Sequence, residues 1–319
     1  MTYYTKGKLL LTGEYAVLKG AKAYAIPAKY GQSLEVKPNH TNRHQWRSYD
    51  LQGMWFEVDF SLNLNRIIQT NEPEKAKLLQ KILQYIQQKK SNLFKSALSF
   101  ITQLDYNRLW GLGSSSTLLV NLYKWSGVNA FELLNISFGG SGYDIAVGLA
   151  GQPILYQLVT PDQINLQNTA YNYGYKTGYN DVNSLPLWQI NQNKSFGFED
   201  KLWLVYLNKK QSSRQAVQNF KKRTVTQADL HEISRISEKL FNKDVDYELF
   251  VELLNRHEHI ISSMINQPTI KQILFKDYPG TIKSLGAWGG DFILATGKDA
   301  PAYFYNKGYQ TIIGYPEIL

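Results

Sequence analysis

Cysteine is absent from this chain of 319 residues. Its absence excludes disulfides, thiolate metal ligands and cysteine nucleophiles. No apolar run approaches the roughly 20 residues that a membrane-spanning helix needs. The N-terminal Met-Thr-Tyr-Tyr-Thr-Lys-Gly-Lys also lacks the apolar core of a signal peptide. We therefore expect a cytoplasmic protein that has no membrane partner.

An acidic balance is also missing, because 35 Lys and Arg outnumber 26 Asp and Glu and give a net charge of +9. Such a charge suits a polyanionic partner, either nucleic acid or a phosphorylated small molecule. The basic residues are scattered in short clusters, and no nucleic-acid-binding motif is visible. We therefore expect a small-molecule partner and no nucleic acid. A basic nucleic-acid-binding protein stays a distant alternative, whose affinity would fall steeply with salt.

The residues that are present indicate a globular protein of two lobes. Hydrophobic residues make up 43% of the chain and charged residues 19%, which is ordinary for such a protein. A chain of this length can bury a sizeable core. Residues 160–200 are polar, rich in Asn, Gln and Tyr, and poorly periodic. We therefore expect loops and irregular hairpins there, and we predict two domains, residues 1–159 and 160–319.

Hydrophobic periodicity predicts mixed α and β structure. The first 58 residues are expected to be nearly all β, with strands at 8–12, 23–26, 32–36, 46–51 and 54–58 and an extended segment at 15–18. Helices are predicted at 72–90, 130–136, 143–150, 214–223, 226–241, 246–264 and 269–275, with another beginning near 118. Further strands are predicted at 96–104, 154–159, 202–207, 282–285 and 292–296, and weak ones near Tyr303 and Thr311.

The stretch at 108–117, Arg-Leu-Trp-Gly-Leu-Gly-Ser-Ser-Ser-Thr, lies between a predicted strand and a predicted helix. Glycines and serines ahead of a helix leave several backbone N–H groups without partners, with the positive end of the helix dipole behind them. Such a place attracts phosphate, and glycine lets the backbone approach closely. No lysine follows the glycines, so the stretch is not a P-loop. An ordinary serine-capped helix is the alternative that this stretch alone leaves open.

Three further segments accompany this stretch. They are Lys-Gly-Lys-Leu-Leu-Leu-Thr-Gly-Glu-Tyr at 6–15, Ser-Gly-Tyr-Asp at 141–144 and Lys-Ser-Leu-Gly-Ala-Trp-Gly-Gly-Asp-Phe at 283–292. Together with Gly-Leu-Gly-Ser-Ser at 111–115 they resemble, in sequence order, the motifs of the GHMP kinases. This superfamily contains the galactose, homoserine, mevalonate and phosphomevalonate kinases. Lys6 stands where the family usually has proline, and Trp288 where a glycine is usual.

The resemblance spans nearly the whole chain and implies an α+β GHMP-kinase fold. The N-terminal lobe would be similar to the second domain of ribosomal protein S5, with a left-handed βαβ crossover, and the C-terminal lobe would be an α/β sandwich. The implied activity is ATP-dependent phosphorylation of a small acid-bearing alcohol, with Mg²⁺ neutralising the phosphates. The first domain would bind ATP and carry the catalytic aspartate, and the second would carry the third glycine motif. The protein would be a monomer or a homodimer.

By the same resemblance, Asp144 takes the proton of the attacking hydroxyl and Lys8 stabilises the developing alkoxide. The alternatives are a carboxylate that caps a helix and a solvated strand lysine. Ser115 matches the family's Mg²⁺ ligand. Glu132 lies one residue from the position of the family's second ligand, which is Leu133 here; its alternative is an exposed helix glutamate. The remaining assignments are ATP contacts by Trp110, Gly111, Leu112, Gly113, Ser114, Ser115 and Ser116, and acceptor contacts by Glu14, Tyr15, Ser141, Gly142, Ser213, Arg214, Gly286, Gly289 and Gly290.

The motifs are most similar to those of phosphomevalonate kinases, because Tyr15 follows Gly-Glu, Trp110 precedes Gly-Leu-Gly and Asp291 follows the third glycine run. Mevalonate kinase comes second, on the Ser-Gly-x-Asp-x-Ala-Val pattern. The loop 208–214, Asn-Lys-Lys-Gln-Ser-Ser-Arg, suits a second anion site for a phosphorylated acceptor; a solvated loop is the alternative. A diphosphomevalonate decarboxylase-like enzyme and a non-catalytic ATP-binding homologue are the rival interpretations.

Overall fold

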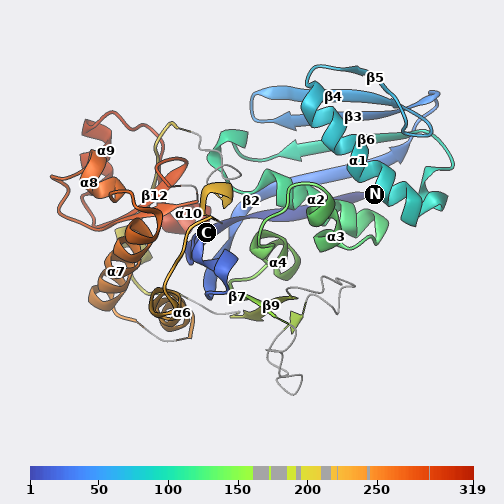
Figure 1. Cartoon of the computed structure of the whole chain (residues 1–319). Coiled ribbons are helices and arrows are strands. Elements are labelled where there is room, and N and C mark those ends of the chain that lie inside the picture. The colour runs from blue at the N-terminus through green and yellow to red at the C-terminus, as the bar shows by residue number, and fades with distance from the viewer. Residues whose placement is uncertain are drawn as a thin grey trace.

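The computed structural model describes residues 1–160, 172–173, 185–191, 195–209, 217–220, 222–242, 245–286 and 288–319. Two β-sheets and the helices packed on them make up this part of the chain (Figure 1). The predicted acceptor residues Ser213 and Arg214 lie outside the described residues. Within the described ranges, no helix is long and apolar enough to cross a membrane.

The larger sheet belongs mainly to the N-terminal half. Its strands are β1 (Thr2–Thr12), β2 (Ala23–Pro38), β3 (Arg43–Asp50), β4 (Gly53–Ser61), β5 (Ile67–Thr70), β6 (Leu98–Leu104), β7 (Ile154–Val159), β8 (Asn172–Tyr173) and β9 (Leu185–Ile190). They are ordered β5–β4–β3–β6–β2–β7–β9–β8, with β1 paired to β2. β3 and β6 run parallel, with Trp46 opposite Phe100. The parallel pair requires a crossover, which β4, β5 and the helix after them supply.

Four helices cover one face of this sheet. They are α1 (Pro73–Lys89), α2 (Ser114–Ser126), α3 (Ala130–Ile136) and α4 (Tyr143–Ala150) (Figure 1). In α1 the apolar residues recur at helical spacing, so Leu79, Ile82, Leu83 and Ile86 all lie on one buried face. They join a single core with Trp46 from the sheet. The helix predicted at 72–90 is confirmed with its predicted apolar stripe.

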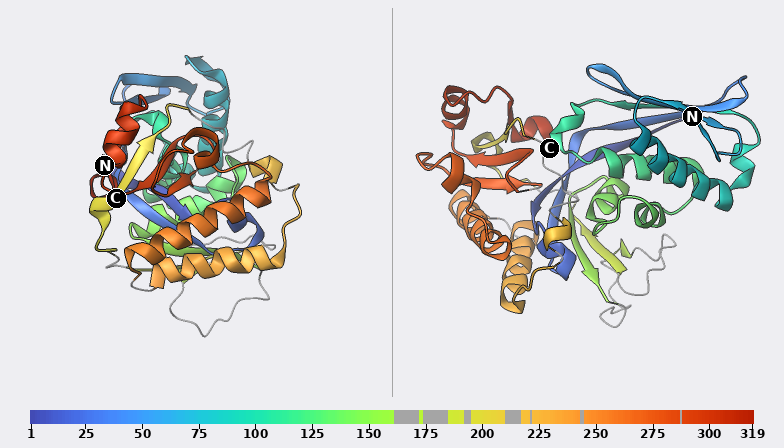
Figure 2. Two further views of the ribbon diagram at one scale, coloured as in Figure 1. Left: turned by 90° about the vertical axis from the view of Figure 1, so that its left-hand side faces the viewer. Right: turned by 45° about the horizontal axis from the view of Figure 1, so that its top comes forward.

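The smaller sheet belongs to the C-terminal half and is antiparallel. Its strands, in spatial order, are β11 (Ile282–Leu285), β12 (Phe292–Thr296), β10 (Leu202–Tyr206) and β13 (Ile312–Gly314). Its helices are α6 (Gln227–Asn242), α7 (Tyr247–Ile265), α8 (Ile270–Leu274), α9 (Ala300–Asn306) and α10 (Tyr315–Ile318). Asp246 caps α7 by accepting the Leu249 N–H at 2.8 Å. Figure 2 shows the two halves side by side.

The two halves share strands β1 and β2. Successive side chains of a strand point to opposite faces. Ala23 and Ala25 therefore join the core beneath α1–α4, whereas Tyr24 and Ile26 pack against the C-terminal half. The second core also contains Leu204 of β10. At this end the larger sheet is covered on both faces, which places β1 and its neighbours between the two halves.

The N-terminal strands are longer than predicted. The strands expected at 23–26 and 32–36 are one strand, β2, and β1 begins at Thr2 and not at residue 8. A strand of this kind tolerates Pro27 because its pairing with β1 shifts register beside Lys8. Turn-forming residues therefore interrupt the ladder locally without ending the strand.

Two short segments were predicted in the wrong state. The extended segment at 15–18 is a 3₁₀ turn, η1 (Ala16–Lys19). The weak strand near Tyr303 is helix α9, which carries a proline in its first turn and buries Phe304. Its Tyr-Phe-Tyr run has strand propensity, but packing of Phe304 into the C-terminal core overrides it.

The larger sheet extends past the predicted domain boundary. β9 pairs with β7, with Trp188 opposite Tyr156, so the sheet continues to Ile190. The smaller sheet begins at Leu202. We propose that the boundary lies between these two residues and not at 159.

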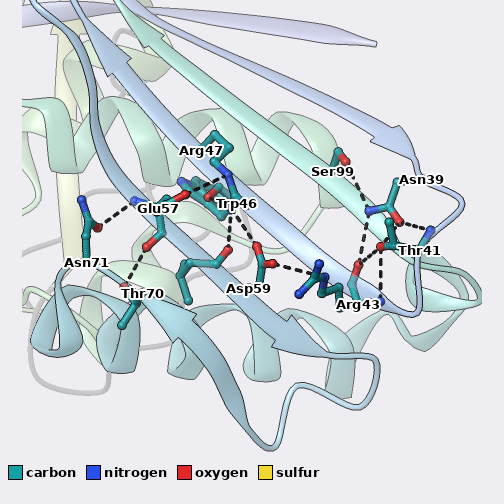
Figure 3. A network of polar contacts seen from close by, with 11 residues as sticks. Asn39, Thr41, Arg43, Trp46, Arg47, Glu57, Asp59, Thr70, Asn71 and Ser99 are labelled. Atoms are coloured by element: carbon teal, nitrogen blue, oxygen red, sulfur yellow. Dashed lines mark hydrogen bonds and ion pairs between the residues drawn. The ribbon is translucent and has the colours of Figure 1, made fainter.

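A polar network lies on β3 and β4 (Figure 3). The Asp59 carboxylate, 1% exposed, accepts a hydrogen bond of 2.8 Å from Arg47 Nη1 and lies 3.3 Å from Arg43 Nε. Arg47 Nε also lies 3.3 Å from the Glu57 carboxylate. A buried carboxylate is tolerated only when such partners compensate its lost hydration. This network therefore fixes the pairing of β3 with β4.

Replacing Asp59 with alanine should lower the free energy of unfolding by about 1.5–3 kcal/mol, because both arginines lose a charged hydrogen-bond acceptor. Urea denaturation measures the change. Glu74→Ala is the matched control: the Lys77–Glu74 pair is 66% and 86% exposed, so its loss should change stability by less than about 0.5 kcal/mol. Equal losses in the two variants would contradict the role given to Asp59.

Candidate active site

The glycine-serine stretch forms a loop that we call the phosphate loop, residues 111–116. A 3₁₀ turn, η3 (Arg108–Trp110), precedes it, and α2 begins within it at Ser114. Gly111 and Gly113 have φ angles of 69° and 89°, which only glycine adopts without strain. The first N–H groups of α2 therefore have no partner within the helix and lie at the positive end of a helix of 13 residues. This geometry agrees with the predicted phosphate site.

The serines of the phosphate loop point in different directions. Ser115 is exposed, whereas Ser116 is buried and donates its hydroxyl to the Gly113 carbonyl at 2.8 Å. The carbonyl of buried Leu112 accepts the backbone N–H of Lys8 at 2.9 Å. A backbone hydrogen bond thus attaches the loop to β1, and the Ser115 side chain stays accessible to a ligand.

Lys8 and Asp144 come together beside this loop, as predicted. Lys8 Nζ lies 3.4 Å from the Gly111 carbonyl and 5.4 Å from the centre of the Tyr143 ring. Burial disfavours the Lys8 cation, but the interaction with the Tyr143 hydroxyl and the negative charges of Asp144 and Asp291 outweigh burial and raise the pKa of Lys8. Lys8 therefore stays an ammonium at neutral pH.

Asp144 lies in the first turn of α4. Its carboxylate accepts the Ile145 N–H at 3.0 Å, so it also serves the capping role that was the alternative. Burial raises the pKa of Asp144, while the neighbouring Lys8 and Ser116 oppose that effect. A carboxyl group with a raised pKa is a better proton acceptor than an ordinary aspartate.

The start of α4 is set by close packing. The Gly142 φ angle is 80°, and a Cβ there would lie 2.9 Å from the Phe131 ring. The Tyr156 hydroxyl donates to the Ser141 carbonyl. Farther along α4, a Cβ on Gly148 would lie 3.0 Å from Thr5 of β1. Ser141 and Gly142, predicted to contact the acceptor, thus have a clear part in orienting Asp144.

Tyr143 is a residue of this site that sequence reasoning missed. Its ring lies beside Lys8, and burial raises the pKa of its hydroxyl. The phenol is therefore neutral at physiological pH and is available as a hydrogen-bond donor. The only signal in the sequence was its position between Gly142 and Asp144 in the Ser-Gly-x-Asp motif.

The third glycine segment approaches the phosphate loop from the C-terminal half. Asp291 is 7% exposed and has a φ angle of 53°, which is unusual for a non-glycine residue. A Cβ on Gly111 would lie 2.6 Å from Asp291 Oδ2, and one on Gly286 would lie 3.4 Å from the same atom. Lys8, Gly111, Gly286 and Asp291 line one small cavity of about 10 Å³. The glycines thus let the two segments meet.

Trp288 does not obstruct that meeting. Its ring is buried in the C-terminal core, where the indole N–H donates to the Pro268 carbonyl at 3.1 Å. Its backbone N–H donates to the Tyr15 hydroxyl at 2.9 Å. With Gly289 and Lys209 it lines a cavity of about 270 Å³. Gly290, the residue after Gly289, is buried.

Glu14 and Tyr15, predicted to contact the acceptor, lie buried at the junction of the two halves. Tyr15 packs on Phe220, with ring centres 5.4 Å apart. Glu14 belongs to a group of four buried residues that we call the interlobe charge cluster. Its members are Glu14, His257, Glu258 and Lys283. We propose that Glu14 joins the two halves and does not bind the acceptor.

Glu132 and Trp110 differ in how well they fit their predictions. The Glu132 carboxylate accepts the Tyr85 hydroxyl at 2.7 Å and lies 3.8 Å from Lys89, so it is directed toward α1. It is thus engaged away from the phosphate loop and does not support the predicted Mg²⁺ role.

Trp110 packs edge-on against Phe292, with ring centres 5.7 Å apart, and lines the small cavity. In the described part of the chain no group of three His, Asp or Glu could hold a metal ion.

The fold is that of a known class of kinases. No protein-family model and no curated protein matches the chain. Among solved structures, the phosphomevalonate kinase of Streptococcus pneumoniae, in complex with phosphomevalonate and AMPPNP, is similar with a TM-score of 0.64 and 18% identity over 98% of this chain and 99% of that one. The chain thus adopts the α+β GHMP-kinase fold, and the predicted fold class is confirmed.

Other members of that class are similar over the same length. The L. major mevalonate kinase, in complex with R-mevalonate, gives a TM-score of 0.60 and 17% identity over 98% of this chain and 94% of that one. The Lactococcus lactis galactokinase, complexed with galactose, gives 0.54 and 12% over 98% and 92%. Because these proteins differ in acceptor, the likeness supports the fold and leaves the acceptor to the site residues.

The interlobe charge cluster should make stability depend on pH. Burial raises the pKa of Glu14 from 4.5 to about 7, although Lys283 opposes the shift. The folded chain then holds a proton that the unfolded chain releases, so this group lowers stability as pH rises from about 4.5 to about 7 and no further above that. The Tm of the wild type should fall more steeply over this range than that of Glu14→Gln. Glu74→Gln, at an exposed position, should follow the wild type; parallel curves for all three would refute the assignment.

Proposed function

We propose that this protein is an ATP-dependent phosphotransferase that acts on a small acid-bearing alcohol. The observation that supports the proposal best is the convergence of Lys8 and Asp144 beside the N-terminus of α2. Phosphorylation of a hydroxyl requires an anion site for the phosphates, a cation and a proton acceptor close together. The N-terminus of α2, Lys8 and Asp144 could supply these three. Lys8 and Asp144 are 136 positions apart in the sequence, so it is the fold that brings them together.

The residues divide the reaction among them. The N–H groups of the phosphate loop bind the phosphates of ATP. Asp144 accepts the proton of the acceptor hydroxyl as its oxygen forms a bond to the γ-phosphorus, and the bond from that phosphorus to the β,γ-bridging oxygen breaks to release ADP. The Lys8 ammonium stabilises negative charge on the attacking oxygen and the transferred group.

A magnesium ion fits this site through the phosphates. Mg²⁺ in kinases is bound by one or two protein ligands together with phosphate oxygens and water. We infer that Ser115, exposed at the start of α2, is a protein ligand, whereas Glu132 is engaged with Tyr85 and Lys89. When bound, the ion would supply neutralisation of phosphate charge.

Phosphomevalonate is the proposed acceptor, and mevalonate is second. The motif details Tyr15, Trp110 and Asp291 favour phosphomevalonate, and Lys209 is an exposed cation on the loop after β10. Trp288 does not support a non-catalytic ATP-binding homologue, because its ring is buried in the C-terminal core; Lys6 and the position of Glu132 are the departures that still favour that alternative. We also propose that the protein acts in the cytoplasm and is a monomer or a homodimer.

Asp144→Asn should reduce kcat by about a hundredfold or more, because the amide cannot accept the proton. Affinity for a non-hydrolysable ATP analogue, measured by calorimetry, should change little. Lys8→Ala should also lower kcat more than nucleotide affinity. Near-wild-type kcat in Asp144→Asn would leave this residue only its capping role.

An acceptor panel tests the substrate assignment. With ATP and Mg²⁺, phosphomevalonate should give a higher kcat/KM than mevalonate, measured by ADP release and product mass. Galactose is the control acceptor that carries no acid group. A higher kcat/KM for mevalonate would transfer the assignment to mevalonate kinase, and loss of carbon dioxide from diphosphomevalonate would favour the decarboxylase.

A further inference from the structure

The interlobe charge cluster connects residues that lie far apart in the chain. Lys283 Nζ, fully buried on β11, lies 2.5 Å from Glu14 Oε1 and 3.3 Å from Glu258 Oε2 on α7. Glu14 Oε2 lies 3.4 Å from His257 Nε2. Glu14 follows β1, so a carboxylate of the N-terminal half is paired with Lys283 of the C-terminal half. This ion pair is one of several polar contacts between the halves, and both of its residues are buried.

The charges within the cluster do not balance. The Gly13 N–H donates to His257 Nε2 at 2.8 Å, and burial holds the pKa of His257 well below its usual value, so the imidazole is neutral. Glu258 accepts from the Ser284 hydroxyl at 2.6 Å and from its N–H. One ammonium thus serves two carboxylates. Buried groups of this kind contribute little net stability, so another role has to account for them.

Both segments that hold the cluster lead into the active site. Glu14 lies on the same segment as Lys8, at the end of β1. Lys283 lies three residues before Gly286, which borders Asp291 and through it the phosphate loop. A shift of β11 relative to β1 would therefore move Asp291 relative to Gly111 and Lys8. The ion pair between Lys283 and Glu14 would oppose that shift, because it joins β11 to the end of β1.

We propose that Glu14, Lys283 and Glu258 are positioning residues that hold the third glycine segment against the phosphate loop. They act through Asp291 and Gly286 and do not touch the substrate. The consequence for turnover rests on the proposed kinase function, but the consequence for the structure does not. The two can therefore be tested apart.

Three variants separate positioning from stability: Glu14→Gln, Lys283→Met and the double variant. Lys283→Met leaves two uncompensated carboxylates and should lower Tm by at least about 5 °C. The double variant removes one carboxylate and one ammonium, so at about pH 8, where Glu14 of the wild type is ionised, the net charge of the cluster equals that of the wild type and Tm should return to within about 3 °C. If Lys283→Met does not fold, Glu14→Gln and the double variant still carry the test.

Two readouts on the double variant decide the question. Hydrogen exchange of the peptide spanning 282–292 should be at least about tenfold faster than in the wild type, with β10 unchanged. With the best acceptor, kcat should fall at least about tenfold while KM for ATP changes less than about threefold. A double variant with restored Tm, wild-type exchange and wild-type kcat would overturn the proposal.

A second ion pair between the halves provides the control. Lys22 pairs with Glu238 of α6, and their side chains are 22% and 40% exposed. Lys22→Met with Glu238→Gln should leave exchange at 282–292 and kcat unchanged. If the wild type phosphorylates no acceptor, the proposed function fails, and faster exchange in the cluster variant alone still supports the positioning role.

Discussion

The hydrogen bond between the Lys8 N–H and the Leu112 carbonyl is the contact on which the site depends. It attaches the phosphate loop to the strand that carries the Lys8 side chain, so the anion site and the cation cannot move independently. The approach is possible because residue 7 is glycine: a Cβ there would lie 2.7 Å from the Leu112 oxygen. One missing side chain in β1 thus allows a loop a hundred residues later to dock, and α2 and Asp144 are placed in turn.

Much of the fold was predictable because its signals are local. The apolar spacing of α1, the Asp246 cap of α7 and the alternation at 32–36 in β2 each follow from a few neighbouring residues. The phosphate loop was predictable for the same reason, since Gly111 and Gly113 mark a left-handed backbone ahead of a helix. Lys8 and Asp144 were found through their motifs, and the structure brings both to this loop.

The remainder depends on contacts that no local pattern contains. Glu14 and Lys283 are 269 positions apart, and the sequence shows only a single lysine in an apolar strand. Glu132 illustrates a different limit. Neighbouring helix residues point about 100° apart, so Leu133 is buried in the core while Glu132 faces α1. A glutamate one position before the family's ligand position therefore contacts α1 and not the phosphate loop. The spacing of the motif in the sequence does not show this contact.

The alternation along β2 also bears on what can fold by itself. Because Tyr24 and Ile26 face the C-terminal half while Ala23 and Ala25 face the N-terminal helices, cutting the chain between the halves would expose an apolar sheet face on the first fragment. Leu9 and Leu11 of β1 would be uncovered with it. Such a surface favours aggregation, so we do not expect the N-terminal fragment to fold as an autonomous domain, and the two lobes should unfold as one cooperative unit.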